Sequence, residues 1–436
     1  MYVPRTRQFW AVAISHFSLD VVMSSVPVLL TFISLYVLPM SAVQFGLIVG
    51  LMQLTGAVTQ PMFGWLTDRI GGRWTGSVGV CWTASMMFMG LLAAESGLML
   101  LMAVIFIITA LGSGAFHPVG MKYAAESHPP REASNMAWFF LAGQMGLAFG
   151  PALVGLLLEN AVPLSNAFGA ALGPGLSGLL QGRGSALPAV WVTLLSLPGF
   201  FLILMHLPGR RAHRAEVAAN AATGTNNGVR SRLSLAVLLL FVAMVSLRSL
   251  GSPGVVSFIP FLFQQKGWTP AEYGLIASLF WVGSGLAGVF FGGLADRYDQ
   301  RLVIAVSMLL SAPTFFLLPL VDGVPAFTLA VLSGTLSGAS HGLVVVLAQG
   351  FLPASRAMAS GAALGLVFGT GAVGSAFIGW LAGIIGLGPS FQLVAVAIVL
   401  ASLLTMLLPA QSRPAGPARE EVLPARSSQG EVNAEG

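Results

Sequence analysis

Charged side chains are scarce in this chain. Only 8% of its 436 residues are charged, whereas 56% are hydrophobic, and a soluble domain carries about 25% charged residues. So few charges cannot cover a solvated surface, so most of the chain is expected to face lipid. The chain also has a single cysteine, which excludes an intrachain disulfide.

Several signatures of other chemistry are missing as well. No Gly-x-x-x-x-Gly-Lys-Ser/Thr run occurs, so ATP hydrolysis is not implied. No Cys/His group has zinc spacing, and no Gly-x-Ser-x-Gly run has a supporting Asp and His. The net charge is +5, but the basic residues form loop clusters rather than a stripe with interleaved aromatics. We therefore expect no enzyme activity, cofactor, metal site or nucleic-acid partner.

Long apolar segments dominate the sequence instead. A membrane-spanning helix needs about 20 mostly apolar residues. Twelve segments qualify: 9–36, 42–66, 74–94, 98–121, 134–158, 187–207, 233–263, 271–294, 302–320, 325–350, 358–384 and 388–408. The pattern predicts an all-α membrane protein with 12 transmembrane helices.

The distribution of Lys and Arg predicts the orientation of these helices. If the N-terminus is inside, the outer connections hold only Arg183 and Lys266, and every other Lys and Arg lies inside, apart from Arg248 within a span. Positive residues concentrate in cytoplasmic loops, so both termini are predicted to be cytoplasmic. We expect a multi-pass protein of a bacterial inner membrane, functioning as a monomer.

The connections also suggest a division of the chain. Residues 208–232 are polar, small and basic, and they separate six spans from six. We interpret 1–207 as an N-terminal six-helix half, 208–232 as a central cytoplasmic linker and 233–409 as a C-terminal six-helix half. Residues 410–436 are rich in Pro, Ser, Ala and Glu, which is typical of a disordered tail.

Few ionisable residues lie inside the apolar segments. Asp20 in the first span and Arg248 in the seventh are the only formal charges there. A charge in hydrocarbon costs roughly 2.5–3.5 kcal/mol on insertion scales, so such a residue is expected to face a partner or a watery cavity. Histidines occupy the same kind of position in spans one, four and ten, as His16, His117 and His341. His16 and Asp20 are four residues apart and share a helix face.

An internal repeat relates the two halves. The connection after the second span carries Gly64, Asp68, Arg69 and Arg73, and the connection after the eighth carries Gly292, Asp296, Arg297 and Arg301 in the same register. Ser113-Gly-Ala-Phe-His117 is similarly echoed by Ser337-Gly-Ala-Ser-His341. The chain is therefore predicted to form two similar six-span halves in parallel orientation. Such repeats place a substrate site near the midplane between the halves.

These motifs resemble those of a known transporter family. The run from Gly64 to Arg73 resembles the signature of the major facilitator superfamily between spans two and three, where it acts as a gating loop. In span five, Gly146, Gly150, Pro151 and Gly155 resemble the antiporter motif of that superfamily, with Val154 in place of one glycine. The resemblance implies the major facilitator fold, with spans one, four, seven and ten around a cavity, and it implies drug efflux in exchange for protons.

Two shorter runs resemble the fosmidomycin-resistance group of this superfamily. They are Ser15-His16-Phe-Ser-Leu-Asp20 in span one and Phe116-His117-Pro118 in span four. The residues after His117 depart from the pattern of that group, so its substrate is not carried over. Polar or aromatic candidates for substrate contact are Gln53, Gln60, Gln144, Gln349, Trp138 and Trp281.

The sequence leads to a hypothesis of proton-coupled export by alternating access. Burial disfavours a charged carboxylate and a nearby cation favours it, so a balanced Asp20 can load and release a proton. Arg248 is then its countercharge or the anchor of an anionic substrate. His16, His117 and His341 modulate the pair.

Other interpretations stay open at this point. Asp20 and Arg248 can be a structural pair, the histidines can be packing groups, and the span-five glycines can serve helix packing alone. A proton symporter or uniporter importing a small organic anion is the alternative transport function. A membrane sensor without transport is the alternative class.

Overall fold

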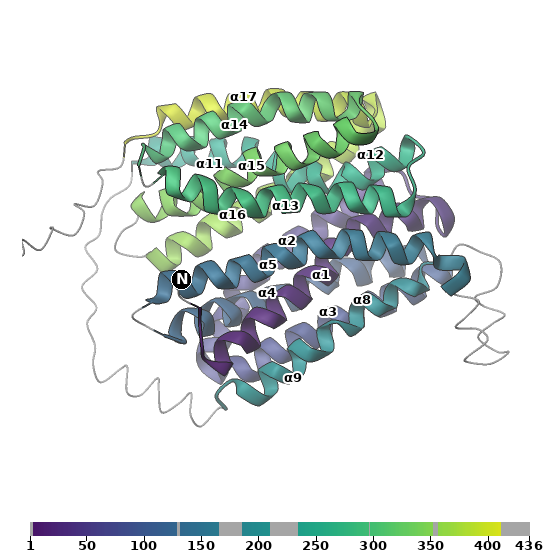
Figure 1. Ribbon diagram of the computed structural model, residues 1–436, viewed down its shortest axis with the longest axis horizontal. Helices are drawn as coiled ribbons and strands as arrows, with labels where there is room; N and C mark the ends of the chain where they lie inside the picture. Colours follow the sequence, from purple (N-terminus) through teal and green to yellow (C-terminus); the bar gives the residue numbers. More distant parts are fainter. Residues whose placement is uncertain are drawn as a thin grey trace, which may run out of the picture.

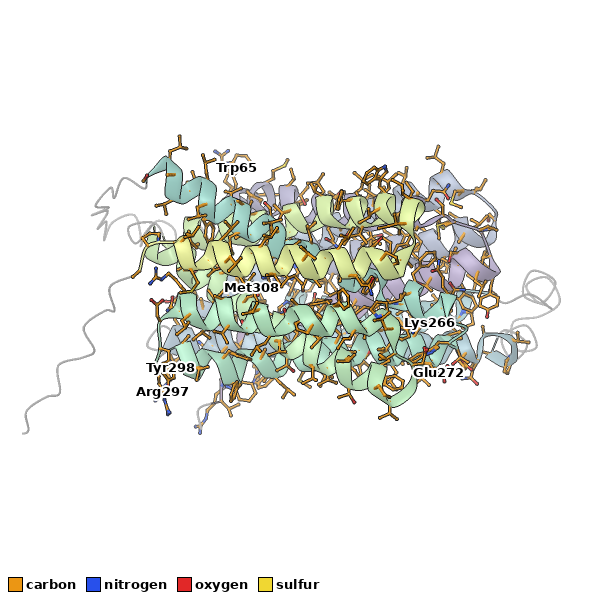
Figure 2. All side chains as sticks on the ribbon, turned by 90° about the horizontal axis from the view of Figure 1, so that it is seen from above. Trp65, Lys266, Glu272, Arg297, Tyr298 and Met308 are labelled. Carbon is orange, nitrogen blue, oxygen red and sulfur yellow. The ribbon has the colours of Figure 1, made fainter. Side chains whose placement is uncertain are left out.

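Long helices packed side by side make up nearly all of the described chain. The computed structural model describes residues 3–128, 131–164, 185–209, 234–295, 297–351 and 356–410. Figure 1 shows the helices lying roughly along one direction in a single bundle. Large apolar side chains such as Leu100, Met205 and Leu239 are exposed on its surface, as expected where lipid replaces water (Figure 2).

Helix occupies each of the predicted spans of the N-terminal half. The helices are α1 (Arg7–Tyr36), α2 (Ala42–Ile70), α3 (Gly72–Glu95), α4 (Met99–Glu126) and α5 (Glu132–Glu159). The sixth span consists of η2 (Leu187–Ala189), α8 (Val190–Leu194) and α9 (Ser196–His206).

The C-terminal half is helical over its six predicted spans as well. Its elements are α11 (Leu235–Ser249), η3 (Leu250–Gly254), η4 (Val255–Phe258), α12 (Ile259–Gln265), α13 (Pro270–Ala295), α14 (Gln300–Leu317), η5 (Leu318–Leu320), α15 (Gly323–Phe351), α16 (Arg356–Ile385) and α17 (Leu387–Leu407). In the described part of the chain, ten helical stretches are long and apolar enough to cross a membrane. Helices α13 and α15 cover the other two predicted spans.

The seventh predicted span is broken rather than continuous. Ser252 has extended dihedral angles (φ −145°, ψ 117°) in the middle of the segment. It is followed by Pro253, which lacks a backbone N–H, and the segment also contains Gly251 and Gly254, which have low helix propensity. The predicted span over 233–263 is long and apolar enough to cross a membrane, but it is not one continuous helix, and α11 and α12 are separate.

Local capping sets where several helices begin. Thr6 accepts a hydrogen bond of 3.2 Å from the backbone N–H of Phe9 at the start of α1. Ser41 and Gln44 form a reciprocal capping box at the start of α2. Gly71 alone joins α2 to α3 with a φ of 88°, a conformation that glycine adopts without strain.

Successive helices run in opposite directions, so the bundle has two ends. We call the end that carries the start of α1 the proximal end and the opposite one the distal end (Figure 1, N marker). Glu272 in the first turn of α13 lies toward the distal end, and Arg297, just after α13, lies at the proximal end (Figure 2). Nearly all of the predicted linker and tail lies outside the described residues, in the ranges 210–233 and 411–436.

The two halves touch closely in the distal part of the bundle. There α5 packs on α13, and α2 packs on α16. A Cβ atom on Gly155 would lie 2.4 Å from the carbonyl oxygen of Pro270, and one on Gly46 would lie 2.6 Å from that of Ser375. Phe45 of α2 also stacks on Phe261 of α12, with ring centroids 5.1 Å apart.

The proximal part of α16 is less crowded. A Cβ atom on Gly365 or Gly369 would meet no described atom within 4 Å. A Cβ atom on Gly379, farther along the same helix, would instead lie 3.1 Å from the Cα atom of Gly46. Among the described residues, the close glycine contacts between the halves therefore lie in the distal part of the bundle.

Candidate functional site

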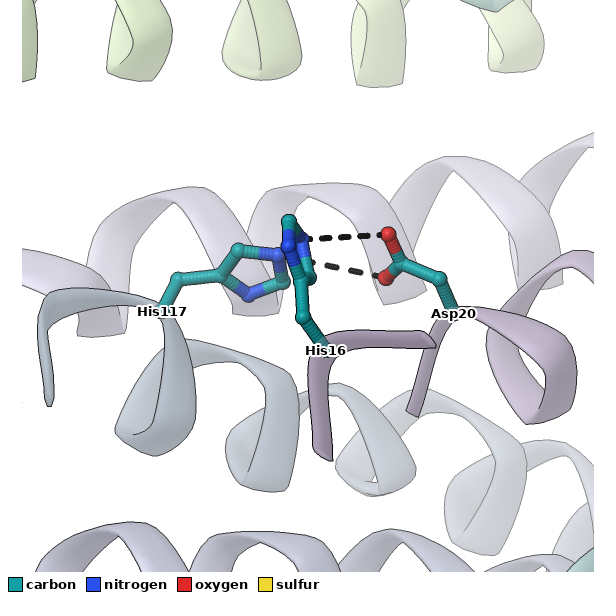
Figure 3. Close-up of side chains that lie close together, drawn as sticks. All are labelled: His16, Asp20 and His117. Atoms are coloured by element: carbon teal, nitrogen blue, oxygen red, sulfur yellow. Dashed lines mark ion pairs between the residues drawn. The ribbon is translucent and has the colours of Figure 1, made fainter. Parts of the chain in front are cut away.

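Three titratable side chains from two helices meet in the N-terminal half. His16 and Asp20 project from successive turns of α1, and His117 projects from α4. The Nε2 atom of His16 lies 3.2 Å from Oδ2 of Asp20. The Nε2 atom of His117 lies 3.9 Å from Oδ1 of the same carboxylate (Figure 3). We call these three residues the His–Asp–His cluster.

Backbone carbonyls fix how the two imidazoles are turned. The Nδ1 atom of His16 lies 2.9 Å from the carbonyl oxygen of Phe139 on α5, and its ring stacks on the Phe139 ring at 4.1 Å. The Nδ1 atom of His117 lies 2.9 Å from the carbonyl oxygen of Ser113. A carbonyl oxygen only accepts, so the tautomer with hydrogen on Nδ1 suits both contacts and leaves each Nε2 to face Asp20.

This arrangement can hold a proton. In a neutral imidazole with Nδ1–H, Nε2 is an acceptor, and an ionised carboxylate oxygen is an acceptor too. Two acceptors 3.2 Å apart repel unless a proton lies between them. The charged or titratable groups around Asp20 are His16 from its own helix and His117 from α4, whereas α5 presents Gly143 and Gly146.

Glycines on α5 make the room that the cluster occupies. A Cβ atom on Gly143 would lie 2.4 Å from Cε1 of His16 and 2.9 Å from Oδ2 of Asp20. Gly146 and Gly150 of the antiporter-like motif abut the backbone of α1, where an added Cβ atom would lie only 2.4 Å and 2.3 Å, respectively, from the nearest carbonyl oxygen. Any larger residue would push α5 away from α1 at the level of Asp20.

The cluster borders a cavity between the two halves. This cavity has a volume of about 200 Å³, and Asp20 and His117 are part of its lining. Most of the wall is apolar, and both Gln53 and Gln60 of α2 contribute polar groups. From the other half, Trp281 of α13 contributes an aromatic ring.

The antiporter-like motif divides between this cavity and the contact of the two halves. Pro151 lines the cavity, whereas Gly155, one helical turn farther along α5, packs at the distal contact with α13. The motif therefore reaches from the cavity wall to the closed end of the bundle.

Arg248 sits in a different environment from Asp20. Its side chain is buried, with Nε donating to Ser340 Oγ at 2.7 Å and an Nη atom donating to the carbonyl oxygen of Ser252 at 3.2 Å. Among the described residues, the ion-pair partners of Asp20 are the two histidines, and Arg248 is absent from the cavity lining. The expected pairing of Asp20 with Arg248 is thus absent from this conformation, because the broken seventh span offers the guanidinium a free carbonyl.

Some predicted site residues fall outside the described side chains. The backbone of His341 lies in α15, but its side chain is outside the described residues. The same holds for Gln349, while Gln144 is absent from the cavity lining. Asp296 is itself outside the described residues, and Gly292 lies in the last turns of α13.

The predicted gating loop after α2 makes contacts within its own half. Asp68 is largely exposed and forms an ion pair of 3.5 Å with Lys122 at the end of α4. The guanidinium of Arg69 lies 3.9 Å from the ring centroid of Trp65, and Arg73 lies in the first turn of α3. Lys122 is therefore one basic partner of Asp68.

The equivalent loop of the C-terminal half is held differently. Asp299 caps α14 by accepting from the backbone N–H of Arg301 at 2.9 Å, and its carboxylate pairs with the guanidinium of that residue at 2.7 Å. Arg301 also donates to the carbonyl oxygen of Leu408 at the end of α17. Arg297 is exposed just beyond α13. Arg301 is therefore held by Asp299 of its own loop and by the end of α17.

Sequence reasoning missed several residues that build the site. Phe139 and Gly143 position His16, and no motif pointed to them. Ser113 was noted only as part of the repeat, although its place one helical turn before His117 indicated a contact with that residue. Asp299 carried a signal too, as an Asp directly before a predicted helix.

Glycine substitutions in the gating loop should have unequal effects. A Cβ atom on Gly72 would lie 2.2 Å from the buried ring of Tyr123, whereas one on Gly64 would lie 3.7 Å from Pro118. We expect Gly72→Ala to destabilise the protein by about 1–3 kcal/mol through overpacking. Gly64→Ala serves as the matched control and should cause no loss. Thermal unfolding of the purified variants measures both, and equal stability of the two would contradict this account of the loop.

Comparison with known proteins identifies the family of this architecture. The family model for the Major Facilitator Superfamily matches residues 9–163 and 233–429. An uncharacterized transporter of this type from Bacillus subtilis, YfnC, is 28% identical over 376 residues, and the match covers 85% of each chain. The fosmidomycin resistance protein of Escherichia coli is 27% identical over 380 residues, again with 85% of each chain covered.

Solved structures agree with this fold. A bacterial homologue of the human lysosomal transporter Spinster superposes with a TM-score of 0.71 at 17% identity, covering 94% of this chain and 97% of its own. The xylose transporter XylE of Escherichia coli superposes with a TM-score of 0.66 at 15% identity, covering 93% and 96%. The expected major facilitator fold is confirmed.

Proposed function

This chain belongs to the Major Facilitator Superfamily, and from that premise we propose that it exports a small organic molecule in exchange for protons. One observation carries the proposal: Asp20 and His117 of the His–Asp–His cluster line the cavity between the halves. A proton bound to Asp20 would therefore lie next to the space that a bound substrate occupies. Protonation of Asp20 and occupancy of the cavity can therefore exclude each other, which is the requirement for antiport.

The close packing of the two halves at the distal end of the bundle supports alternating access. Close glycine contacts between Gly155 and Pro270 and between Gly46 and Ser375 seal the distal part. On our orientation the proximal end is cytoplasmic, so this conformation receives substrate from the cytoplasm. Rocking of the halves would open the distal contacts and close the proximal ones. The proton would then enter from the outside and be released inside.

The cavity wall favours an organic cargo over a small inorganic ion. Its lining is mostly apolar, with the amides of Gln53 and Gln60 and the indole of Trp281 as polar contacts. Such a wall suits a compact molecule with apolar and hydrogen-bonding parts. The name of the Escherichia coli relative suggests fosmidomycin or a similar drug as a first compound to test.

The remaining parts of the proposal concern location and assembly. We place the protein in a bacterial inner membrane as a monomer, with both termini, the linker of 208–232 and the tail of 410–436 in the cytoplasm. Arg248 and His341 remain candidates for a role in a later step of the cycle, when the C-terminal half has moved. Import of a small organic anion anchored by Arg248 is the competing function.

Coupling is tested by transport in inverted membrane vesicles. Growth of an efflux-deficient strain on a panel of toxic compounds, fosmidomycin included, first identifies a substrate. Uptake of that substrate into inverted vesicles with an acidic interior should then exceed uptake without a gradient. A protonophore should abolish the difference, because it removes the pH gradient. Unchanged uptake after its addition would refute proton coupling, and uptake into intact cells that requires Arg248 would favour import.

A further inference from the structure

We propose that the His–Asp–His cluster is also a binding site for a divalent transition-metal ion of the zinc type. One ligand atom from each of His16, Asp20 and His117 lies within 4.8 Å of the other two. Imidazole nitrogen and carboxylate oxygen are common zinc ligands, with bonds of about 2.0–2.2 Å. Zinc spacing is absent from the sequence because the ligands come from two helices about 100 residues apart.

The contact distances are close to those that a metal ion needs. Two ligands at about 2.0–2.2 Å from a tetrahedral ion lie roughly 3.3–3.5 Å from each other. The Nε2 atom of His16 lies 3.2 Å from Oδ2 of Asp20, just below this spacing. The Nε2 atom of His117 lies 3.9 Å from the other carboxylate oxygen, Oδ1, and the three ligand atoms lie within 4.8 Å of one another, so His117 has to move closer to complete the site. Its side chain borders the cavity, so it has room for that movement.

The surrounding hydrogen bonds prepare both histidines for a metal. Metal-binding histidines usually donate the hydrogen of their other ring nitrogen to a carbonyl or carboxylate. His16 does so to Phe139 O and His117 to Ser113 O, each at 2.9 Å. Both Nε2 lone pairs are thereby directed at one carboxylate. A proton is one cation that this arrangement accepts, and a zinc ion is another.

The site would leave part of the ion open to the cavity. Three protein ligands and an open fourth position are typical of zinc sites that keep a bound water or substrate. Asp20 and His117 line the cavity, so the fourth position faces it. Two nitrogen donors and one carboxylate suit zinc, cobalt or nickel, whereas calcium and magnesium prefer oxygen ligands.

Metal binding should stop the transport cycle. An ion held by all three side chains displaces the proton of the cluster, because metal ligands must be deprotonated. The cluster can then no longer alternate between protonated and free states. This inhibition rests on the proposed proton coupling, whereas the binding step does not.

Cobalt and zinc titrations test the binding step directly. The full chain, purified in detergent without a polyhistidine tag, is titrated with Co²⁺ while visible absorption is recorded, and Zn²⁺ is then added as competitor. We expect saturable binding of one ion per chain, with displacement by Zn²⁺. Asp20→Asn and His117→Gln should each weaken binding at least tenfold, because each removes a ligand and even loss of an outer-shell partner typically costs roughly 10–100-fold.

A matched histidine variant serves as control. His206 lies at the end of α9, where its Nδ1 bonds to Leu202 O, far along the chain from the cluster. His206→Gln should bind Co²⁺ as the unmodified chain does. Thermal unfolding without metal shows whether each variant is folded. Absence of saturable binding, or equal affinity in a folded His117→Gln variant, would overturn the metal site.

Transport in the presence of Zn²⁺ separates this proposal from the proposed function. Zinc at saturating concentration should abolish gradient-driven uptake in vesicles, and a chelator should restore it. Binding without inhibition would leave the metal site standing but contradict the role of the cluster in coupling. Inhibition at zinc concentrations far below those that fill the site in the Co²⁺ competition would show that zinc acts elsewhere and would overturn the inhibitory role of the site.

Discussion

Asp20→Asn is expected to abolish proton-driven accumulation of substrate while leaving the protein folded. A pH difference of one unit stores about 1.4 kcal/mol per proton, which supports roughly tenfold accumulation for one proton exchanged per substrate. An amide cannot carry that proton, so the accumulation ratio should fall to about one. The Asn side chain has the shape of Asp, and its amide N–H can donate to Nε2 of His16 across the present 3.2 Å contact.

An exchange assay separates loss of coupling from loss of the protein. Substrate-for-substrate exchange across vesicles needs alternating access but no net proton movement, so it should persist in Asp20→Asn. Asp322→Asn provides a matched carboxylate control, because Asp322 pairs with Lys266 at the distal end, away from the cavity lining. Full accumulation in the Asp20 variant would remove this residue from the coupling mechanism.

Gly155→Val is expected to prevent the distal end from closing. The new Cβ would lie 2.4 Å from Pro270 O and 3.1 Å from the Cα atom of Gly274. These are backbone atoms, so relief requires α5 and α13 to separate. Overpacking of this kind costs about 1–3 kcal/mol, which corresponds to a shift of roughly 5- to 150-fold between two states. Transport should fall by a similar factor, because the cycle depends on the closed state.

Accessibility of a cavity residue measures that shift. In a chain whose only native cysteine, Cys81, is replaced by Ser, a cysteine is introduced at Gln53, which lines the cavity. Its reaction with a membrane-impermeant thiol reagent added from the distal side should be faster in Gly155→Val. Gly293→Val is the control, because a Cβ there meets no described atom within 4 Å. Equal reaction rates in all three chains would contradict a distal closure built on Gly155.

The sequence predicted where the helices lie along the chain better than it predicted which face of each helix is buried. Length and apolar composition locate a span, and the repeat relates the two halves. A helix that is apolar on every side does not reveal which face is buried. His16 and Asp20 were therefore assigned to one face, but Phe139 and Gly143 of α5 could not be identified as their neighbours.

Arg248 shows a second limit of sequence reasoning. Arg248 lies 228 residues after Asp20, which is the offset of the loop repeat, so the two hold equivalent positions in spans one and seven. A repeat relates positions and not side-chain partners. The residues that decide the partners of Arg248 are Ser252 and Ser340. Ser252 accepts through its backbone carbonyl, which lies at the local break in the helix. The residue types in the sequence do not show where such a carbonyl points. His117 lies near Asp20, and both helices are unbroken there.

The break in the seventh span gives the C-terminal half a hinge that the first span, its counterpart in the N-terminal half, lacks. Helix α1 runs without interruption for 30 residues, whereas its counterpart has a non-helical residue at Ser252 between α11 and α12. Pro253, Val256 and Ser257, next to the break, line the cavity. A short helix joined through such a hinge can tilt while the rest of its half stays still. We therefore expect α12 to respond to cargo before the halves rock, so that the cavity is enclosed first by a local movement of one side.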